Sequence, residues 1–251
     1  LGNPNACEYL NRETNNGISY GAYVEEGNEE EVETAGFDTI FSDLLKRRFL
    51  DLRKTDAAGL RDFCAGTEAI FCKPAGLCGG EGIQRLITAD IDDYDALYDR
   101  LIKGGQLLIE EPIRQHPDMN KLCPDSVNTV RIVTLVTAQG AQMVYALVRM
   151  GMGGVCVDNV SSGGMYAPVN EHGQLYRPAF CDKTGKYYER HPVTGTEIMG
   201  FQIPLFDQAL ELCRTASRRV EAHLKYIGWD VAITPDGPVL VEGNNLPGYD
   251  C

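Results

Sequence analysis

The stretch GWDVAITPDGPVLVEGNN, residues 228–245, constrains the fold of this chain more than any other part of its sequence. Two apolar runs flank a Pro-Asp-Gly turn, which predicts a β-hairpin. A turn centred on Asp236 places Asp230 directly opposite Glu242, with their Cβ atoms about 5 Å apart. Because strand residues alternate between the two faces, Asn244 falls on the same face as Glu242. The hairpin therefore gathers two carboxylates and an amide on one side.

The same register predicts which residues of the hairpin are buried. Ala232 is expected opposite Leu240, and the face away from the acids is expected to pack into the core. That predicted core face comprises Val231, Ile233, Val239 and Val241.

Two carboxylates that face each other across a hairpin repel and destabilise it. A hard cation would offset this repulsion, and two carboxylates with an amide oxygen suit Mg²⁺, which prefers oxygen ligands. The hairpin thus predicts a magnesium site at Asp230, Glu242 and Asn244. An ordinary exposed hairpin that carries scattered acids is the alternative, and both stay open at this point.

The composition limits the classes of partner. The 251 residues carry a formal net charge of −13, which argues against a surface for nucleic acid or for anionic membranes. An odd number of cysteines, nine, cannot all pair, and none forms a C-x-x-C motif. We therefore expect reduced thiols in a cytoplasmic protein. No apolar run approaches the ~20 residues of a membrane helix and no signal peptide is visible, so membrane insertion is not expected.

The hydrophobic pattern predicts a mixed α+β chain. The first 35 residues read as a flexible, acidic segment. Apolar spacing predicts one helix over 37–63. The clearest helix is predicted over 205–227, which starts after Pro204 and is closed by Gly228. A further helix is expected over 90–105. Strands are expected over 68–74, 106–112, 128–138 and 141–151, the last two joined by a turn at Gln139-Gly140, and 77–87 is expected to be a Gly turn that leads into another strand.

A lysine and a glycine-rich loop suggest a place for phosphates. Lys73 ends a strand, and glycines follow at 76, 79, 80 and 82, where backbone N–H groups can approach a polyphosphate. The pattern is neither a P-loop nor the dinucleotide fingerprint. Taken alone, an ordinary Gly-rich hairpin is as good an interpretation. Glu110 and Glu111, at the end of the next strand, suit a purine and its ribose, or are simply solvated acids.

Arginines within apolar strands are the third signal. Arg131 and Arg149 each lie in a run of β-formers, and a buried arginine needs a partner. A phosphate suits the planar guanidinium, and a structural ion pair is the competing interpretation. Asn159, Ser161 and Ser162 offer a polar loop nearby. His116 and His191 each precede a proline and are better explained by structural hydrogen bonds, and Trp229 is better explained as core.

In this order, the Lys-Pro and Gly loop, the Glu-Glu strand end, NTVRIV, ALVRMGMGGVCVDNVSSGG and the Asp…Glu-x-Asn hairpin resemble the ATP-grasp superfamily. The group of sugar-transfer-associated ATP-grasp proteins, related to the glutamate-ligase type, is the most similar, over about residues 60–250. The resemblance implies an α+β ATP-grasp fold in which two lobes clamp ATP with Mg²⁺, after a reduced N-terminal region. The division it implies is 1–60 for that region, 61–112 for the small lobe and 113–251 for the large lobe.

The resemblance also implies roles for residues. Phosphates would be covered by Lys73 and the loop with Gly79, Gly80 and Gly82, and Glu110 and Glu111 would lie at the adenine hinge. Catalytic contacts to the γ-phosphate would come from Arg131, Arg149 and Asn159, and Mg²⁺ would be held by Asp230, Glu242 and Asn244. The family's second ATP-contacting lysine has no clear counterpart, although Lys46 and Lys54 are candidates.

The function that follows is an ATP-dependent carboxylate–amine ligase that proceeds through an acyl phosphate. Its substrates would be a small-molecule carboxylate and an amine, and the family name points to sugar-linked compounds and cell-surface polysaccharide synthesis. Two alternatives remain: a small-molecule kinase on the same scaffold, and a nucleotide-binding module without catalysis.

Overall fold

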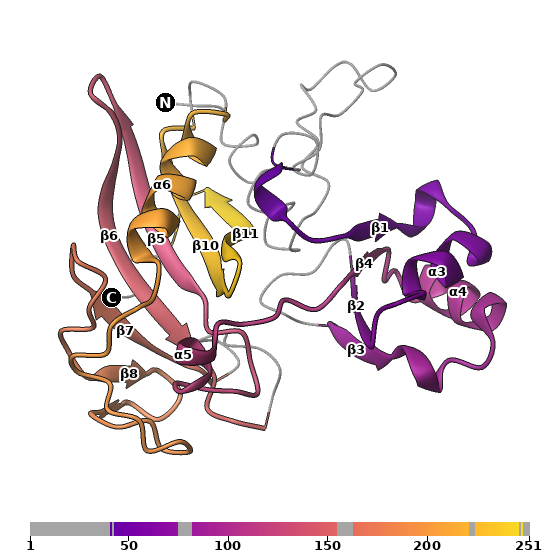
Figure 1. Ribbon diagram of the computed structural model, residues 1–251, viewed down its shortest axis with the longest axis horizontal. Helices are drawn as coiled ribbons and strands as arrows, with labels where there is room; N and C mark the ends of the chain where they lie inside the picture. Colours follow the sequence, from indigo (N-terminus) through magenta and orange to yellow (C-terminus); the bar gives the residue numbers. More distant parts are fainter. Residues whose placement is uncertain are drawn as a thin grey trace.

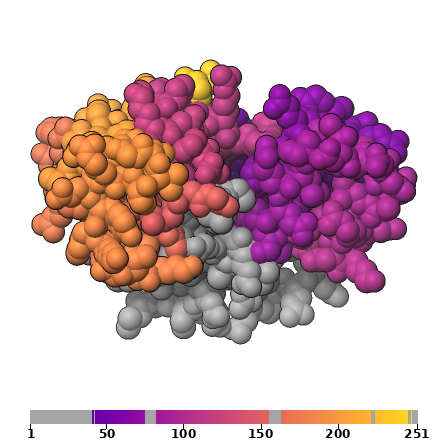
Figure 2. Space-filling view, turned by 90° about the horizontal axis from the view of Figure 1, so that it is seen from below, coloured from indigo at the N-terminus to yellow at the C-terminus, as the bar shows by residue number. Residues whose placement is uncertain are grey.

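The computed structural model describes residues 41, 43–74, 82–154, 163–220, 224–245 and 247 of the chain. These residues form two lobes that lie side by side, joined by the segment after residue 110 and by the segment before residue 49 (Figure 1). The space-filling view shows the same two lobes, one built from the indigo and magenta part of the chain and one from its later residues (Figure 2). Among the helices described, none is long and apolar enough to cross a membrane.

The small lobe is a four-stranded antiparallel sheet with two helices packed against it (Figure 1). The strand order is β1-β4-β2-β3, and Asp56 and Asp93 cap the helices by accepting backbone N–H bonds from Gly59 and Ala96. Its elements are β1 (Phe49–Asp51), η1 (Leu52–Lys54), α3 (Ala57–Cys64), β2 (Ala69–Lys73), β3 (Gln84–Ile87), η2 (Thr88–Asp90), α4 (Tyr94–Lys103) and β4 (Leu108–Glu110).

The large lobe is a seven-stranded antiparallel sheet in the order β11-β10-β5-β6-β7-β8-β9. One helix, α6, lies across one face of this sheet (Figure 1). The elements are α5 (Pro117–Asn120), β5 (Val130–Thr137), β6 (Gly140–Met150), β7 (Met165–Val169), β8 (Ala179–Cys181), β9 (Lys186–Tyr188), α6 (Phe206–Ser217), β10 (Tyr226–Thr234) and β11 (Gly237–Asn245).

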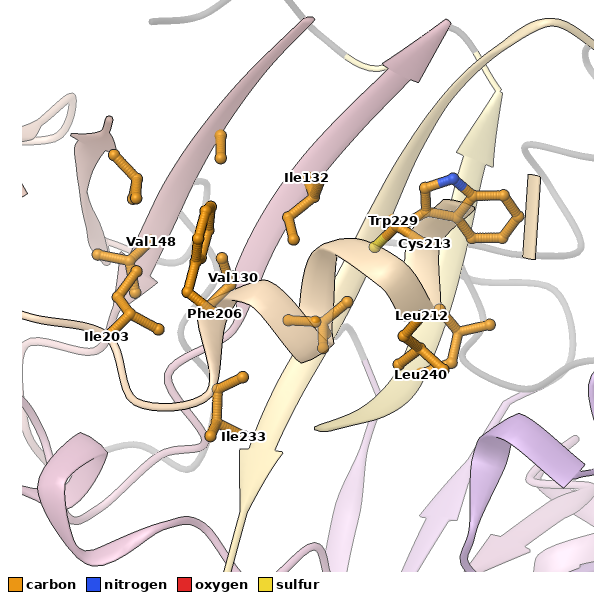
Figure 3. Close-up of a cluster of buried hydrophobic side chains, with 14 of the residues drawn as sticks. Val130, Ile132, Val148, Ile203, Phe206, Leu212, Cys213, Trp229, Ile233 and Leu240 are labelled. Carbon is orange, nitrogen blue, oxygen red and sulfur yellow. The ribbon is translucent and has the colours of Figure 1, made fainter. Parts of the chain in front are cut away.

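The main core lies between the large sheet and α6 (Figure 3). Trp229 is 1% exposed, and its indole Nε1 donates to Thr134 Oγ1 at 2.9 Å and to Ser217 Oγ at 3.0 Å. Phe41 packs edge-on against the indole, with ring centroids 5.6 Å apart. Trp229 is thus a core residue, as the sequence predicts. The odd-numbered residues of β10 from 227 to 233 face this core, so its even-numbered residues face the other side of the sheet. Burial of Trp229 therefore fixes which side carries Asp230.

The prediction of one helix over 37–63 is wrong. Residues 43–45 are helical, but the chain then runs as β1 at the edge of the small sheet before α3 begins. Lys46 takes a positive φ of 50°, which stops the first helical segment. β1 therefore belongs to the sheet of the small lobe, although the sequence places residues before 61 in a separate region; the division into domains stays a prediction.

The helix predicted over 205–227 is shorter than expected. It begins after Leu205, which has a φ of 55°, and ends at Ser217, so Ile227 and Gly228 belong to β10 instead. Gly228 is not a helix cap: a Cβ at this position would lie 2.7 Å from Pro247 Cβ. The glycine is required because the chain after β11 packs directly on the strand.

The hairpin register is confirmed at its open end and wrong near its turn. Asp230 pairs with Glu242 as predicted, but Leu240 pairs with Val231 rather than with Ala232. A β-bulge between the two regions inserts one extra residue on β11 and absorbs the difference. Leu240 therefore joins the core face with Val231. Val239 is predicted on that face, but it pairs with Ala232 and lies on the other one.

Candidate active site

The face of the large sheet opposite α6 carries the polar residues that the sequence predicts to be functional. Alternation along β5, β6, β10 and β11 sends the core residues to one side and the arginines and acids to the other. Direct strand pairing brings Asp230 beside Arg131 on β5 and Glu242 on β11. Residues that lie about a hundred positions apart in the sequence thus become neighbours.

Asp230 is the centre of this cluster and is completely buried. Arg131 binds it with two hydrogen bonds, Nε to Oδ1 and Nη2 to Oδ2, each of 2.7 Å. Arg149 adds a bond of 2.5 Å from Nη2 to Oδ2, while its Nε donates to Thr129 Oγ1 at 3.0 Å. Although burial opposes ionisation, the two guanidinium groups hold the pKa of Asp230 below its usual range. In this structure the buried partner of both arginines is therefore a carboxylate.

Glu242 is more accessible than Asp230, with 16% of its side chain exposed. Its Oε1 accepts from Asn244 Nδ2 at 3.1 Å and lies 3.6 Å from Arg131 Nη2. Burial and the facing carboxylate of Asp230 raise the pKa of Glu242 above its ordinary value. The contact with Arg131 acts in the opposite direction but is long, and Asp230 already occupies that guanidinium. The charges of the two guanidinium groups are balanced only when Asp230 and Glu242 are both ionised.

These residues fit a hard cation in part. Glu242, whose side chain is 16% exposed, and the buried Asn244 place oxygen atoms on one face, and repulsion between the two carboxylates would be relieved by positive charge. Asp230 would have to share its oxygens with the arginines or be released by one of them. Among the described residues, no third acid, histidine or cysteine joins Asp230 and Glu242 here. A third protein ligand would therefore come from Asn244.

A second buried ionic cluster lies where the two lobes meet. Glu110, 3% exposed, accepts from Lys73 Nζ at 2.8 Å and from Arg47 Nε at 3.4 Å, both at Oε2. Burial opposes ionisation, but Lys73 and Arg47 hold the pKa of Glu110 below its ordinary value. Arg47 also donates from Nη1 to the carbonyl of Leu240 at 2.6 Å, which links this cluster to the hairpin of the large lobe.

Two buried atoms of this cluster, Glu110 Oε1 and Arg47 Nη2, have no hydrogen-bond partner among the residues that the structure describes. Buried polar atoms are nearly always hydrogen-bonded, so such a pair is typical of a site that a ligand completes. Sequence reasoning missed Arg47. The run Lys46-Arg47-Arg48 marks a basic segment but does not show which cation turns inward, and the other candidate, Lys54, is 75% exposed beside Asp51.

The remaining predicted residues are placed as follows. Glu111 turns away from Glu110 and pairs with Arg48 at 3.1 Å on the surface. Gly82 has a φ of 74° and its carbonyl accepts from Gln106 Nε2 at 2.8 Å. The predicted residues Gly79, Gly80 and Asn159, with Ser161 and Ser162, lie outside the described residues.

Both proline-linked histidines make structural hydrogen bonds, as predicted. His116 caps α5 by accepting the backbone N–H of Asp118 at 3.1 Å. His191 is 1% exposed; its Nε2 bonds the carbonyl of Gly151 at 2.8 Å, and its Nδ1 accepts from the backbone N–H groups of Val193 and Thr194, each at 3.3 Å. The bonds at Nδ1 require a neutral ring protonated at Nε2. His191 therefore anchors the segment that follows Arg149.

A cleft of about 620 Å³ opens between the lobes. Phe71 and Arg85 line it from the small lobe, and the large lobe contributes residues of 112–127 and Gly154. None of the predicted site residues that the structure describes lines this cleft. It is therefore a space beside the two ionic clusters and not the clusters themselves.

The comparison with protein families decides what this architecture is. Residues 53–251 match the model of the family described as "Sugar-transfer associated ATP-grasp". The chain belongs to this ATP-grasp family. Its α+β fold, with a small and a large antiparallel sheet, is thus the ATP-grasp fold that the sequence predicts.

Solved structures of similar fold have low sequence identity to this ATP-grasp protein. The ATP-grasp ligase PsnB, in a complex with Mg and ADP, is 17% identical with a TM-score of 0.47, over 84% of this chain and 48% of that one. D-alanyl-alanine synthetase A from Vibrio cholerae is 14% identical with a TM-score of 0.48, over 84% and 53%. N5-carboxyaminoimidazole synthase from Aspergillus clavatus is 9% identical with a TM-score of 0.49, over 98% and 47%.

The chain spans about half the length of these solved proteins. No functionally curated protein matches it in sequence.

Proposed function

We propose that this ATP-grasp protein is an ATP-dependent carboxylate–amine ligase that acts through an acyl phosphate. Membership of the family supports the use of ATP. The observation that carries the proposal is the pair of buried ionic clusters, one where the two lobes meet and one on the large sheet. One cluster holds a lysine and an arginine for phosphates, and the other holds two arginines and two carboxylates. Small-molecule kinases would use the same nucleotide site, so the fate of the phosphate separates the two reactions.

The nucleotide site would be built around Lys73. Its ammonium, fixed by Glu110, is a compact charge at the start of the glycine-containing loop. The unpartnered Nη2 of Arg47 and Oε1 of Glu110 would gain partners from the nucleotide, a phosphate oxygen for the first and a donor for the second. Adenine would lie along Glu110 and Glu111 at the hinge, and Gly79, Gly80 and Gly82 would cover the phosphates.

The metal site would use Glu242 and Asn244, with Asp230 as third ligand. When bound, Mg²⁺ neutralises phosphate charge and orients the γ-phosphoryl group. Ionised Glu242 is required for this role, so the raised pKa in the free protein means that binding would be accompanied by proton release. Arg131 and Arg149, freed in part from Asp230, would then face the transferred phosphoryl group together with Asn159.

In the reaction, an oxygen of the substrate carboxylate attacks the γ-phosphorus, a new P–O bond forms, and the bond to the β-phosphate breaks to release ADP. The amine nitrogen then attacks the acyl carbon, the C–O bond to phosphate breaks, and the amine loses a proton as the amide forms. The arginines would act by positioning and by charge stabilisation, with no covalent bond to the protein. The family description supports sugar-linked substrates and a place in polysaccharide assembly.

A cytoplasmic location is part of the proposal. Free thiols at Cys64, Cys72, Cys123, Cys181 and Cys213 support it, because reducing compartments preserve thiols.

The test follows the label from γ-labelled ATP, with Mg²⁺ and a metabolite extract. We expect labelled inorganic phosphate only when metabolites are present, together with a new amide. Label that remains on a small molecule would identify a kinase instead. ATP binding without turnover in any fraction of the extract would refute catalysis and leave a nucleotide-binding module.

A further inference from the structure

A row of aromatic side chains runs outward from Arg149 across the large sheet. Arg149 on β6 pairs directly with Tyr166 on β7, Tyr166 pairs with Phe180 on β8, and Phe180 pairs with Tyr187 on β9. Residues that pair directly across strands share a face of the sheet. The three rings therefore lie on the face of the arginines and Asp230, away from α6.

The rings touch one another in sequence. The centroids of Tyr166 and Phe180 are 6.0 Å apart at 76°, and those of Phe180 and Tyr187 are 4.8 Å apart at 46°. Exposure rises along the row, from 9% at Tyr166 to 72% at Tyr187. The alternate residues Ala179 and Cys181 point into the core. The row thus starts beside a buried arginine and ends as an open aromatic surface.

We propose that this aromatic row, Tyr166, Phe180 and Tyr187, binds the pyranose ring of a sugar-linked substrate. The inference rests on the proposed ligase function and assigns the part of the site that recognises the substrate. A pyranose has apolar faces of C–H groups and a rim of hydroxyls, so it packs flat on aromatic rings while its rim stays hydrated. An anionic ligand would gain little from these rings, because their faces carry partial negative charge.

The spacing fits a substrate of defined length. Neighbouring strands are about 4.8 Å apart, so Tyr187, three strands from Arg149, lies roughly 14 Å from it along the sheet. A sugar on Phe180 and Tyr187 would leave room for one linking group that reaches the arginines.

Strand pairing alone does not explain the outer end of the row. Cross-strand aromatic pairs do stabilise edge strands, but a ring that is 72% exposed gains little from burial. The adenine is expected at the hinge near Glu110, on the other side of the lobe junction, so it would not occupy the row. The proximity to Arg149 favours a substrate over an unrelated partner.

The test is saturation-transfer NMR on the full chain with methyl pyranosides of glucose, galactose, mannose and N-acetylglucosamine as probes. We expect transfer to the ring C–H protons of at least one glycoside, and about tenfold weaker binding in Tyr187→Ala. Tyr187→Phe keeps the ring and should bind normally. Val144→Ala is the control, since Val144 is also an exposed apolar residue (51%) of the same sheet, on β6.

The thermal shift produced by Mg-ATP is measured on the same samples and separates this inference from the function. A normal shift with no glycoside signal, or with a signal unchanged in Tyr187→Ala, would overturn the aromatic row as a sugar site and leave the nucleotide site standing. Transfer to an unstructured octapeptide but to no glycoside would also overturn it. Glycoside binding that depends on Tyr187, without any response to Mg-ATP, would support the row and refute the ligase.

Discussion

Replacement of Asp230 by asparagine is expected to destabilise the protein strongly, in contrast to replacement of its neighbour Glu242 by glutamine. Asp230 is completely buried and accepts three charged hydrogen bonds of 2.5–2.7 Å from Arg131 and Arg149. Asparagine keeps one carbonyl oxygen but puts an NH₂ donor where guanidinium donors converge. Breaking a buried ion pair on one side costs about 3–5 kcal/mol. At this chain length the loss corresponds to a fall in Tm of roughly 6–20 °C.

Glu242→Gln is the matched control, because it makes the same carboxyl-to-amide change on the same face of the sheet. The pKa of Glu242 is raised, so the folded protein favours its neutral form, which glutamine resembles. Glutamine Oε1 can still accept from Asn244. We expect a change within about 1 kcal/mol. Since a raised pKa means that the folded state retains a proton that the unfolded chain has released, wild-type stability should fall as pH rises above 4.5, and this slope should flatten in the variant.

The assay is urea denaturation of both variants without nucleotide, followed by the Mg-ATP thermal shift of each against its own baseline. The proposal predicts that both lose the shift, because both residues are counted as metal ligands. An Asp230→Asn protein as stable as the wild type would refute the buried ion pair. Equal destabilisation by the two changes would refute the distinction between them, and a retained Mg-ATP shift in both would refute the metal assignment.

Three further changes test other parts of the structure. Arg47→Ala removes the link between Glu110 and the hairpin, so it should lower the free energy of unfolding by about 2–3 kcal/mol and weaken the Mg-ATP shift. Arg48→Ala is the control at an exposed ion pair and should lower it by less than about 1 kcal/mol, both measured by urea denaturation. Burial lowers the pKa of His191 below 6.5, so the neutral ring stabilises the fold above pH 6.5 and this stabilisation is lost as the pH falls. His191→Asn should flatten the dependence of the unfolding free energy on pH in this range, and an unchanged dependence would contradict the prediction. Trp229→Phe deletes two hydrogen bonds and should lower the free energy of unfolding by about 1–2 kcal/mol. Equal urea midpoints for the variant and the wild type would disprove this.

Local patterns predicted much of the fold because they depend on neighbours in the sequence. The helix over 94–103 follows from its Asp93 cap and its apolar spacing, and the paired strands of β5 and β6 follow from their β-branched runs. The long helix predicted over 37–63 failed for the opposite reason. Its apolar spacing suited a helix, but the edge of the small sheet offered β1 a partner in β4, and that tertiary pairing overrode local propensity.

The hairpin shows how the predicted pairing of Asp230 with Glu242 can be right although the predicted register near the turn is wrong. Near the turn, the observed pairing is shifted by one residue from the predicted pairing. If this shift continued along the strands, Glu242 would face away from Asp230. The bulge on β11 restores the pairing, and it also re-aims Leu240 into the core. A bulge at this position costs ladder hydrogen bonds and has no sequence signature here. The fold accepts it because it puts an apolar residue against α6 and an acid opposite Asp230 on the same short strand.

The partners of the arginines could not be predicted from the sequence, and they change how the site is understood. A phosphate or a carboxylate satisfies a buried guanidinium equally well, and only the alignment of β5, β6 and β10 shows that Asp230 takes both. In the free protein Asp230 therefore stands in for the anion that the proposed reaction would supply. Exchange of that carboxylate for a phosphoryl group would release Asp230 to the proposed Mg²⁺ site, so that the arginines and the buried carboxylate would each keep a partner of opposite charge.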